Sequence, residues 1–269
     1  MVRPQVMAVV NVTPDSFSDG GHFADPAAAV RHALNLAEQG ADILDIGGES
    51  TRPGAAPVSE DEEIARVLPV IAGVRRHSAI PISVDTMKPA VMRAARAAGA
   101  DIWNDVSALT WAPDSPAVAA ELDCPVVLMH MKGEPATMQA DPVYDDVVGE
   151  VLRYLQARAE AAVQAGVARE RIWLDPGIGF GKTAAHSLEL LAHLDRIVAL
   201  RFKTVLGVSR KRFIQAVDPS AAQASDRLGG SIAGALVGAE AGVHAVRVHA
   251  VRETVQALAL WAAVKRASI

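Results

Sequence analysis

The chain has 269 residues, of which 51% are hydrophobic and only 4% aromatic, and its formal net charge is −5. This length accommodates one α/β barrel as readily as two small domains. The acidic balance argues against partners such as nucleic acid or a membrane surface, and no apolar run approaches the roughly 20 residues of a membrane span. The single cysteine, Cys124, excludes an intramolecular disulfide and predicts a buried thiol in a cytoplasmic protein.

Short apolar runs alternate with Ala- and Leu-rich segments along the whole chain. The runs predict strands at residues 6–12, 43–46, 80–84, 101–104, 126–130, 171–175, 204–208 and 243–248. Helical spacing follows at 27–39, 60–76, 90–98, 143–165 and 228–241, and several helices should end in glycine, at Gly40, Gly99, Gly166 and Gly242. Eight such units predict one α/β domain over residues 1–269, a (β/α)8 TIM barrel. An open doubly wound sheet is the alternative, because periodicity alone does not show closure.

The loop at residues 11–21, Asn-Val-Thr-Pro-Asp-Ser-Phe-Ser-Asp-Gly-Gly, follows the first predicted strand directly. A polar loop that leaves a strand end is a typical place for chemistry in α/β proteins, although a solvated surface turn would have the same composition. What favours chemistry is that polar residues recur at the ends of the later strands: Asp45, Glu49, Thr51 and Arg52; Asp85; Asn104 and Asp105; His130; Asp175; Ser209, Arg210 and Lys211; Arg247 and His249.

In a closed parallel barrel these strand ends share one mouth, where ligands bind. A single member could instead cap a helix or brace a turn, and we expect that structural role for Asp45 and Asp105. The rest form two chemical halves. Asp85, Asn104 and Asp175 suit a flat heterocycle rich in N–H donors, whereas the cationic residues suit a phosphate or carboxylate: Arg52, Arg210, Lys211, Arg247 and His249.

Several familiar motifs fail on inspection. Residues 175–183 resemble a phosphate-binding P-loop, but Pro176 stands where its first glycine belongs. Lys182 stands where a dinucleotide fingerprint needs its third glycine. The 8 histidines contain no helical two-histidine zinc motif. A Mg²⁺ ion held by oxygen ligands near Asn11 would be consistent with a phosphate-bearing substrate.

Taken in order, the motifs at residues 11–21, 45–54, 83–86, 104–106, 129–131, 175–182, 209–211 and 247–249 resemble those of the dihydropteroate synthase family. The resemblance covers nearly the whole chain, and its first, second and sixth motifs are long and specific. It implies a folate-pathway transferase on a (β/α)8 barrel that joins (7,8-dihydropterin-6-yl)methyl diphosphate to 4-aminobenzoate, releasing diphosphate and 7,8-dihydropteroate. Such enzymes are typically homodimers and are the target of sulfonamides.

The resemblance also implies a role for each matching residue. The pterin would be bound by Asp85, Asn104, Asp175 and Lys211, the diphosphate by Thr51, Arg52, Arg247 and His249, and Mg²⁺ by Asn11. Phe17, Pro53, Phe180, Ser209 and Arg210 would surround the aminobenzoate, and Asp19 would stabilise a cationic intermediate. Asp19, Lys211, Arg247 and His249 are therefore the predicted catalytic residues.

One position departs from the family pattern, because Ala250 follows the last motif where relatives usually have Asp. Two other functions are compatible with such a barrel. A methyltransferase acting on methyltetrahydrofolate would reuse the acidic pterin pocket, but it has no need of a diphosphate clamp such as Arg52, Arg247 and His249. A paralogue that binds pterin without catalysis would be expected to have lost first-loop or anion-site residues, which are present here.

Overall fold

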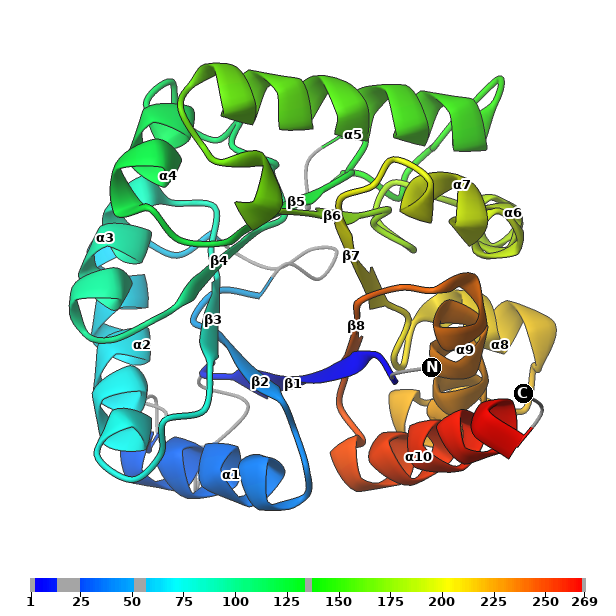
Figure 1. Ribbon diagram of the computed structural model, residues 1–269, viewed down its shortest axis with the longest axis horizontal. Coiled ribbons are helices and arrows are strands. Elements are labelled where there is room, and N and C mark those ends of the chain that lie inside the picture. The colour runs from blue at the N-terminus through cyan, green and yellow to red at the C-terminus, as the bar shows by residue number, and fades with distance from the viewer. Residues whose placement is uncertain (1–2, 14–24, 51–56, 134–136, 268–269) are drawn as a thin grey trace.

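The computed structural model describes residues 3–13, 25–50, 57–133 and 137–267. Its strands form one closed parallel barrel in chain order, and β8 pairs with β1. Figure 1 shows the strands as a ring with the helices outside it. The strands are β1 (Gln5–Asn11), β2 (Ile43–Gly47), β3 (Ile82–Asp85), β4 (Ile102–Asp105), β5 (Val126–Met129), β6 (Ile172–Asp175), β7 (Lys203–Gly207) and β8 (Ala245–Val248). The predicted TIM barrel is confirmed, and the open sheet is excluded.

The helices cover the outside of the barrel; the last follows β8, and the others connect successive strands. They are α1 (Pro26–Glu38), α2 (Glu60–Arg75), α3 (Pro89–Ala97), α4 (Ser115–Leu122), α5 (Val147–Gln164), α6 (Ala184–Ala192), α7 (Leu194–Val198), α8 (Arg212–Val217), α9 (Leu228–Ala241) and α10 (Val251–Ala267). None of these helices is long and apolar enough to cross a membrane. The four predicted glycines do lie at helix ends with positive φ, from 87° at Gly242 to 110° at Gly99.

Alternation along each strand separates two apolar layers. Val6, Ala8 and Val10 of β1 pack under the helices, in the same cluster as Val246 and Val248 of β8. The opposite faces of the strands fill the barrel with Met7, Ile43, Ile102, Val127, Trp173, Val205 and Ala245. On four of these strands the next inward-facing position toward the carboxyl end is polar: Asp45, Asn104, Asp175 and Arg247. The candidate site therefore lies directly above a packed apolar floor.

The predicted helix at residues 143–165 is wrong at its start, because α5 begins at Val147. Asp146 caps the helix by accepting a hydrogen bond from the Gly149 N–H at 2.8 Å. The residues before it take another path, along which the Tyr144 hydroxyl donates to the Gly181 carbonyl at 2.8 Å. The buried thiol predicted for Cys124 is confirmed, with 2% of the residue exposed.

Candidate active site

Arg247 of β8 is the centre of the polar layer inside the barrel. Its Nε donates to Asp45 Oδ2 at 2.6 Å, and its Nη2 donates to Asp85 Oδ2 at 2.8 Å. Asn104 Nδ2 lies 3.2 Å from the same Asp45 oxygen. Burial opposes the charge on Arg247, but the neighbouring carboxylates of Asp45 and Asp85 raise its pKa above the ordinary value. The sequence interpretation of Asp45 as a loop brace is therefore wrong, since this fully buried carboxylate holds Arg247 and Asn104 from below.

Asp85 and Asp175 are the two carboxyl groups at the acidic half of the mouth. Burial raises the pKa of Asp85 to about 7; Arg247 opposes the shift, and Asp45 adds to it. Its Oδ1 is buried without a hydrogen-bond partner among the residues that the structure describes. Burial also raises the pKa of Asp175, against the pull of Lys211, and its Oδ1 accepts from the Gly177 N–H at 2.7 Å. A buried carboxylate oxygen without a partner is costly, so Asp85 is suited to accept from a ligand.

Two inward-facing glycines keep the mouth open. A Cβ at Gly207 would lie 3.6 Å from Lys211 Nζ and 3.8 Å from Asp175 Oδ2. A Cβ at Gly47 would lie 3.4 Å from the Cβ of Asp85. A side chain at Gly207 would lie between the cationic Lys211 and the acidic Asp175, and one at Gly47 would lie against Asp85. The sequence interpretation missed both glycines, although a glycine that ends a strand next to a polar residue is a usable signal of close approach.

The cationic half lies at the ends of β7 and β8. His249 Nδ1 is 3.0 Å from the hydroxyl oxygen of Ser209, which also accepts from the His249 backbone N–H at 3.2 Å. Lys211 Nζ donates to the Ile178 carbonyl and lies 4.7 Å from the centroid of the Phe180 ring. Burial lowers the pKa of Lys211 to about 8, although Asp175 acts in the opposite direction. Arg210 is exposed, and its backbone is fixed at φ 61° by a bond to Ser231.

An apolar wall stands beside these charges. Met87, Val106 and Met129 form a small buried cluster against which Met131 and Phe180 pack. This wall gives a flat ring a surface to contact, while the carboxylates of Asp85 and Asp175 are available at its edge. Sequence reasoning identified Phe180 but not the methionines, whose wide use in cores makes them uninformative without a structure.

Two residues that the sequence placed in the mouth are not functional groups there. Asp105 braces its own loop, as predicted, by accepting from the backbone N–H groups of Ser107 and Leu109 at 2.7 and 2.8 Å. The expectation that His130 lies at the mouth is wrong. His130 is buried, lies 2.8 Å from Lys182 Nζ and packs edge-on against Tyr154 of α5, because its position alternates to the helix side of β5.

Asp19, Phe17, Thr51, Arg52 and Pro53 lie outside the described residues. The chain on either side of residues 51–56 is firmly held. Glu49 Oε1 accepts from the Val58 N–H at 2.9 Å, and Glu49 Oε2 accepts from Lys88 Nζ at 2.8 Å. The same ammonium donates to Glu63 of α2 at 2.6 Å. This buried ion-pair cluster ties the second loop to α2 and α3.

Asn11 ends β1 with a half-buried side chain on the inward-facing side of the strand. Among residues 3–13, 25–50, 57–133 and 137–267, no group of three His, Cys, Asp or Glu side chains is arranged to hold a metal ion. An amide oxygen is nevertheless a suitable Mg²⁺ ligand, because this ion commonly takes only one or two protein ligands beside water and phosphate oxygens. The donor set at Asn11 therefore fits an ion that arrives with a phosphate-bearing substrate.

Comparison with known proteins gives the family. Residues 7–249 match the model of the pterin binding enzymes. The dihydropteroate synthase of Escherichia coli K12 is 47% identical over 259 residues, covering 95% of this chain and 90% of the relative. The Xanthomonas albilineans dihydropteroate synthase, solved with 4-aminobenzoic acid, is 51% identical with a TM-score of 0.92 and covers 98% of this chain and 93% of the other. The Yersinia pestis enzyme, solved as a sulfonamide drug complex, is 43% identical, with a TM-score of 0.92 and coverage of 98% and 95%.

These matches extend over nearly the whole of both chains, so the resemblance is not limited to a shared barrel. They favour the synthase over a methyltetrahydrofolate methyltransferase and over a pterin binder without activity. The chain therefore belongs to the dihydropteroate synthase family of pterin-binding enzymes, the transferases of folate biosynthesis that condense (7,8-dihydropterin-6-yl)methyl diphosphate with 4-aminobenzoate.

Proposed function

We propose that the barrel mouth binds the dihydropterin ring through Asp85, Asn104 and Asp175. The observation that carries this proposal is the pair of buried carboxyl groups beside Gly47 and Gly207, with Asp85 Oδ1 lacking a partner in the described part of the chain. A 2-amino-4-oxo ring edge presents several N–H donors, which carboxylate oxygens can accept. Lys211 is the remaining proposed pterin contact, near Asp175 and over the Phe180 ring.

The diphosphate is expected at the cationic half. Arg247 uses two of the five N–H donors of a guanidinium for Asp45 and Asp85, so it has further donors for an anion. His249 stands beside Ser209 at the adjacent strand end. Thr51 and Arg52 of the second loop are the proposed additional contacts. Mg²⁺ bound at Asn11 would neutralise part of the diphosphate charge and so make it a better leaving group.

The second substrate, 4-aminobenzoate, is expected between the apolar wall and the end of β7. Phe180 would contact its ring together with Phe17 and Pro53 of the first two loops. Ser209 and Arg210 would hold its carboxylate, for which a guanidinium is the geometrically matched partner. Sulfonamides would occupy the same position.

The reaction then requires positioning and charge stabilisation more than a strong base. The bond between the pterin methylene carbon and the diphosphate oxygen breaks, the amine nitrogen of 4-aminobenzoate bonds to that carbon, and the nitrogen loses one proton. Arg247 and His249 donate to the leaving diphosphate, and Lys211 holds the pterin ring. The proposed role of Asp19 is to stabilise the positive charge that develops on the pterin, which exists only near the transition state.

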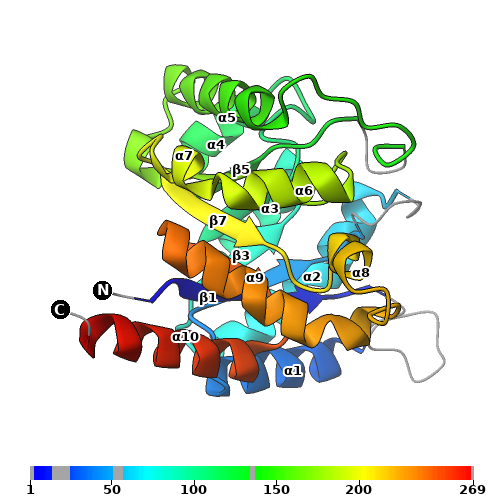
Figure 2. The same cartoon turned by 90° about the vertical axis from the view of Figure 1, so that its right-hand side faces the viewer.

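We further infer a homodimer in the cytoplasm. Figure 2 shows α6, α8 and α9 on one side of the barrel, and each carries exposed large apolar side chains: Leu188 of α6, Val217 of α8, and Leu228 and Val237 of α9. An exposed apolar surface of this kind is typical of an interface between subunits. Sedimentation of the purified protein should give the mass of two chains, and Val217→Asp should shift it toward one chain.

The proposed function is tested by following both products in one assay. The protein is incubated with (7,8-dihydropterin-6-yl)methyl diphosphate, with and without 4-aminobenzoate and Mg²⁺, while diphosphate release and dihydropteroate formation are measured. Both products should appear in equal amounts only when all components are present. Diphosphate release without dihydropteroate would show a hydrolase instead.

A further inference from the structure

The glycine-rich loop after β6 has an unusual set of hydrogen bonds. From residue 177 to residue 181, every backbone carbonyl accepts a bond from a side chain. The pairs are Gly177 with Lys182 at 2.9 Å, Ile178 with Lys211 at 2.5 Å, Gly179 with Gln139, Phe180 with Lys182 at 2.9 Å, and Gly181 with Tyr144 at 2.8 Å. Two of the five bonds come from the same ammonium group, so Lys182 is the main donor of this clamp.

The loop needs external donors because of its own sequence. Gly177, Gly179 and Gly181 all have positive φ, at 64°, 80° and 58°. A Cβ at Gly177 would lie only 1.9 Å from the His130 carbonyl oxygen, and one at Gly181 only 2.2 Å from that of Lys132. The loop thus packs backbone to backbone on the chain that follows β5. Glycine is the most flexible residue and brings no side chain to hold the loop, so bonds to its carbonyls must fix it.

Lys182 is buried and bonds to two segments of the chain. Only 3% of the residue is exposed, and its Nζ also lies 2.8 Å from His130 Nδ1 and 3.3 Å from the His130 carbonyl oxygen. Burial, and then the charge of Lys182, lowers the pKa of His130 to about 3, so the imidazole stays neutral. Burial also lowers the pKa of Lys182 well below its ordinary value. Lys182 therefore joins the loop after β6 to the end of β5.

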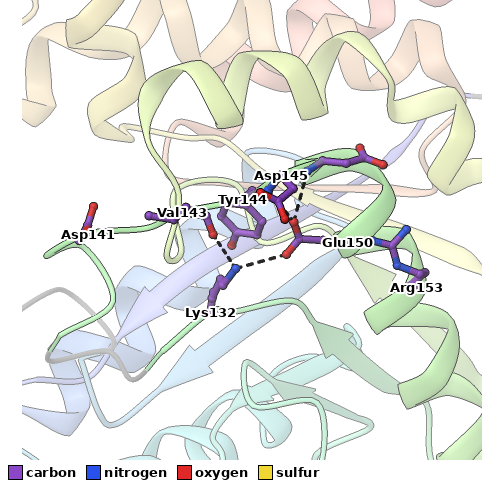
Figure 3. Close-up of a pocket in the computed structure, with 8 residues that line it drawn as sticks. Lys132, Asp141, Val143, Tyr144, Asp145, Glu150 and Arg153 are labelled. Atoms are coloured by element: carbon purple, nitrogen blue, oxygen red, sulfur yellow. Dashed lines mark hydrogen bonds and ion pairs between the residues drawn. The ribbon is translucent and has the colours of Figure 1, made fainter.

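Tyr144 holds the far end of the same loop from the protein surface. Its ring lines a cavity of about 430 Å³, shown in Figure 3, together with Lys132 and Glu150. Lys132 Nζ lies 4.2 Å from the centroid of the Tyr144 ring and 3.2 Å from Glu150 Oε2. The ring is thus fixed on one side while its hydroxyl reaches the Gly181 carbonyl.

Phe180 is the residue whose position this clamp determines. Its ring packs on the apolar wall of Met87, Val106 and Met129, and it lies under Lys211 Nζ. Its own carbonyl is bonded to Lys182. Without the Lys182 amino group, the Phe180 carbonyl would lose its side-chain donor, and the Gly177 carbonyl would keep only the Phe180 backbone N–H at 3.0 Å. The Phe180 ring would then be held less firmly against the wall.

We propose that Lys182 is a positioning residue for the second substrate: by clamping the carbonyls of Gly177 and Phe180, it fixes the Phe180 ring and so sets the affinity for 4-aminobenzoate. This inference rests on the proposed function, which places the aminobenzoate against Phe180. Three of the proposed pterin contacts, Asp85, Asn104 and Asp175, lie on strands rather than on the loop. Lys211 is the one that also bonds to the loop, at the Ile178 carbonyl, so the pterin should be affected less than the aminobenzoate.

The test compares the two Michaelis constants in steady-state kinetics. Lys182→Met should raise the KM for 4-aminobenzoate by at least about tenfold, because a displaced Phe180 ring no longer positions this substrate. The KM for the pterin diphosphate should change by less than about threefold. Tyr144→Phe removes one hydroxyl and keeps the ring, so it should give a smaller change in the same direction. Tyr154→Phe is the matched control, because its ring also packs on His130, and it should change neither constant.

Equal rises in both constants, or no change in either, would overturn the proposal. If Lys182→Met does not fold, Tyr144→Phe decides alone: a KM for 4-aminobenzoate equal to that of Tyr154→Phe would refute the clamp. Failure of the unmodified enzyme to form dihydropteroate would instead refute the proposed function, so the two outcomes are distinguishable.

Discussion

Asp85 and Asp175 differ in the hydrogen bonds that their carboxylate oxygens accept from the protein. Asp175 accepts from the backbone of Gly177, whereas Asp85 is bonded to Arg247 through one oxygen and has the other buried. Both carboxyl groups have a raised pKa because they are buried. Residue type and strand position were enough to predict this acidic half. The sequence could not reveal that Asp45 belongs to it, because its partners Arg247 and Asn104 come from strands far away in the chain.

Asp175→Asn tests pterin recognition directly. The amide places two hydrogens where the ring also presents donors, and losing a charge-assisted hydrogen bond should cost roughly 1.5–3 kcal/mol. We therefore expect a tenfold or greater loss of pterin affinity in calorimetry, at about 1.4 kcal/mol per factor of ten. Asp218→Asn, at an exposed turn, is the control and should have no effect. Unchanged affinity in Asp175→Asn would remove this residue from the pterin site.

The raised pKa of Asp85 predicts that pterin affinity depends on pH. With its pKa raised to about 7, the free protein at neutral pH holds a proton on part of its Asp85 groups. A pterin that donates N–H bonds favours the ionised form, so binding should release a proton and affinity should increase as the pH rises from about 6 to about 8. The sign for stability is opposite: a raised carboxyl pKa makes the free energy of unfolding fall as the pH rises from about 4 to about 7.

Proton release is measured by calorimetry of pterin binding in two buffers that differ in ionisation enthalpy. The apparent binding enthalpy should differ between the buffers for the unmodified protein and should not differ for Asp85→Asn. The same buffer dependence in both proteins would assign the proton to another group.

At the scale of elements, α10 follows a residue whose side chain cannot accept a hydrogen bond. Ala250 directly precedes the helix, and its carbonyl accepts from the Thr254 N–H at 3.2 Å. Ala250→Asp should supply the missing acceptor for the first N–H groups and stabilise the fold by roughly 0.5–2 kcal/mol, measured by urea unfolding. Ala263→Asp, on the exposed face of the last part of the same helix, should destabilise it. A gain from both variants, or from neither, would contradict the capping account.

The buried ion-pair cluster of Lys88, Glu49 and Glu63 predicts a loss of stability on substitution instead of a gain. Lys88 neutralises Glu63, whose pKa burial would otherwise raise further, and it also holds Glu49. Lys88→Met leaves a buried carboxylate without its cation and should lower the free energy of unfolding by roughly 3–5 kcal/mol. Lys265→Met breaks a half-exposed pair with Glu240 and should cost at most about 1 kcal/mol. Similar losses in the two variants would show that the Lys88 cluster is not structurally special.

Element positions were largely readable from hydrophobic periodicity. The predicted and observed strands agree to within about two residues, because each apolar run spans one buried strand with turn residues on both sides. The start of α5 was missed by four residues, from 143 to Val147, since nothing local distinguishes Tyr144 as a helix residue from Tyr144 as a donor to Gly181. That contact joins residues 37 apart in the chain.

At the scale of the whole molecule, closure of the barrel gives the polar strand ends their common function. Pairing of β8 with β1 brings Arg247 next to Met7 and places its guanidinium between Asp45 and Asp85. Periodicity indicated eight units, a number that favoured a barrel over an open sheet, but it could not show this closure. The charge separation across the mouth, with carboxylates from β2, β3 and β6 and cations after β7 and on β8, is a property of the closed ring.

One measurement tests this arrangement most directly: a crystal structure of the protein with a non-hydrolysable analogue of the pterin diphosphate. The account predicts the ring between Asp85, Asn104 and Asp175, and the phosphate groups between Arg247 and His249. Density for the analogue at another place, such as the cavity beside Lys132 and Tyr144, with the mouth left empty, would contradict it.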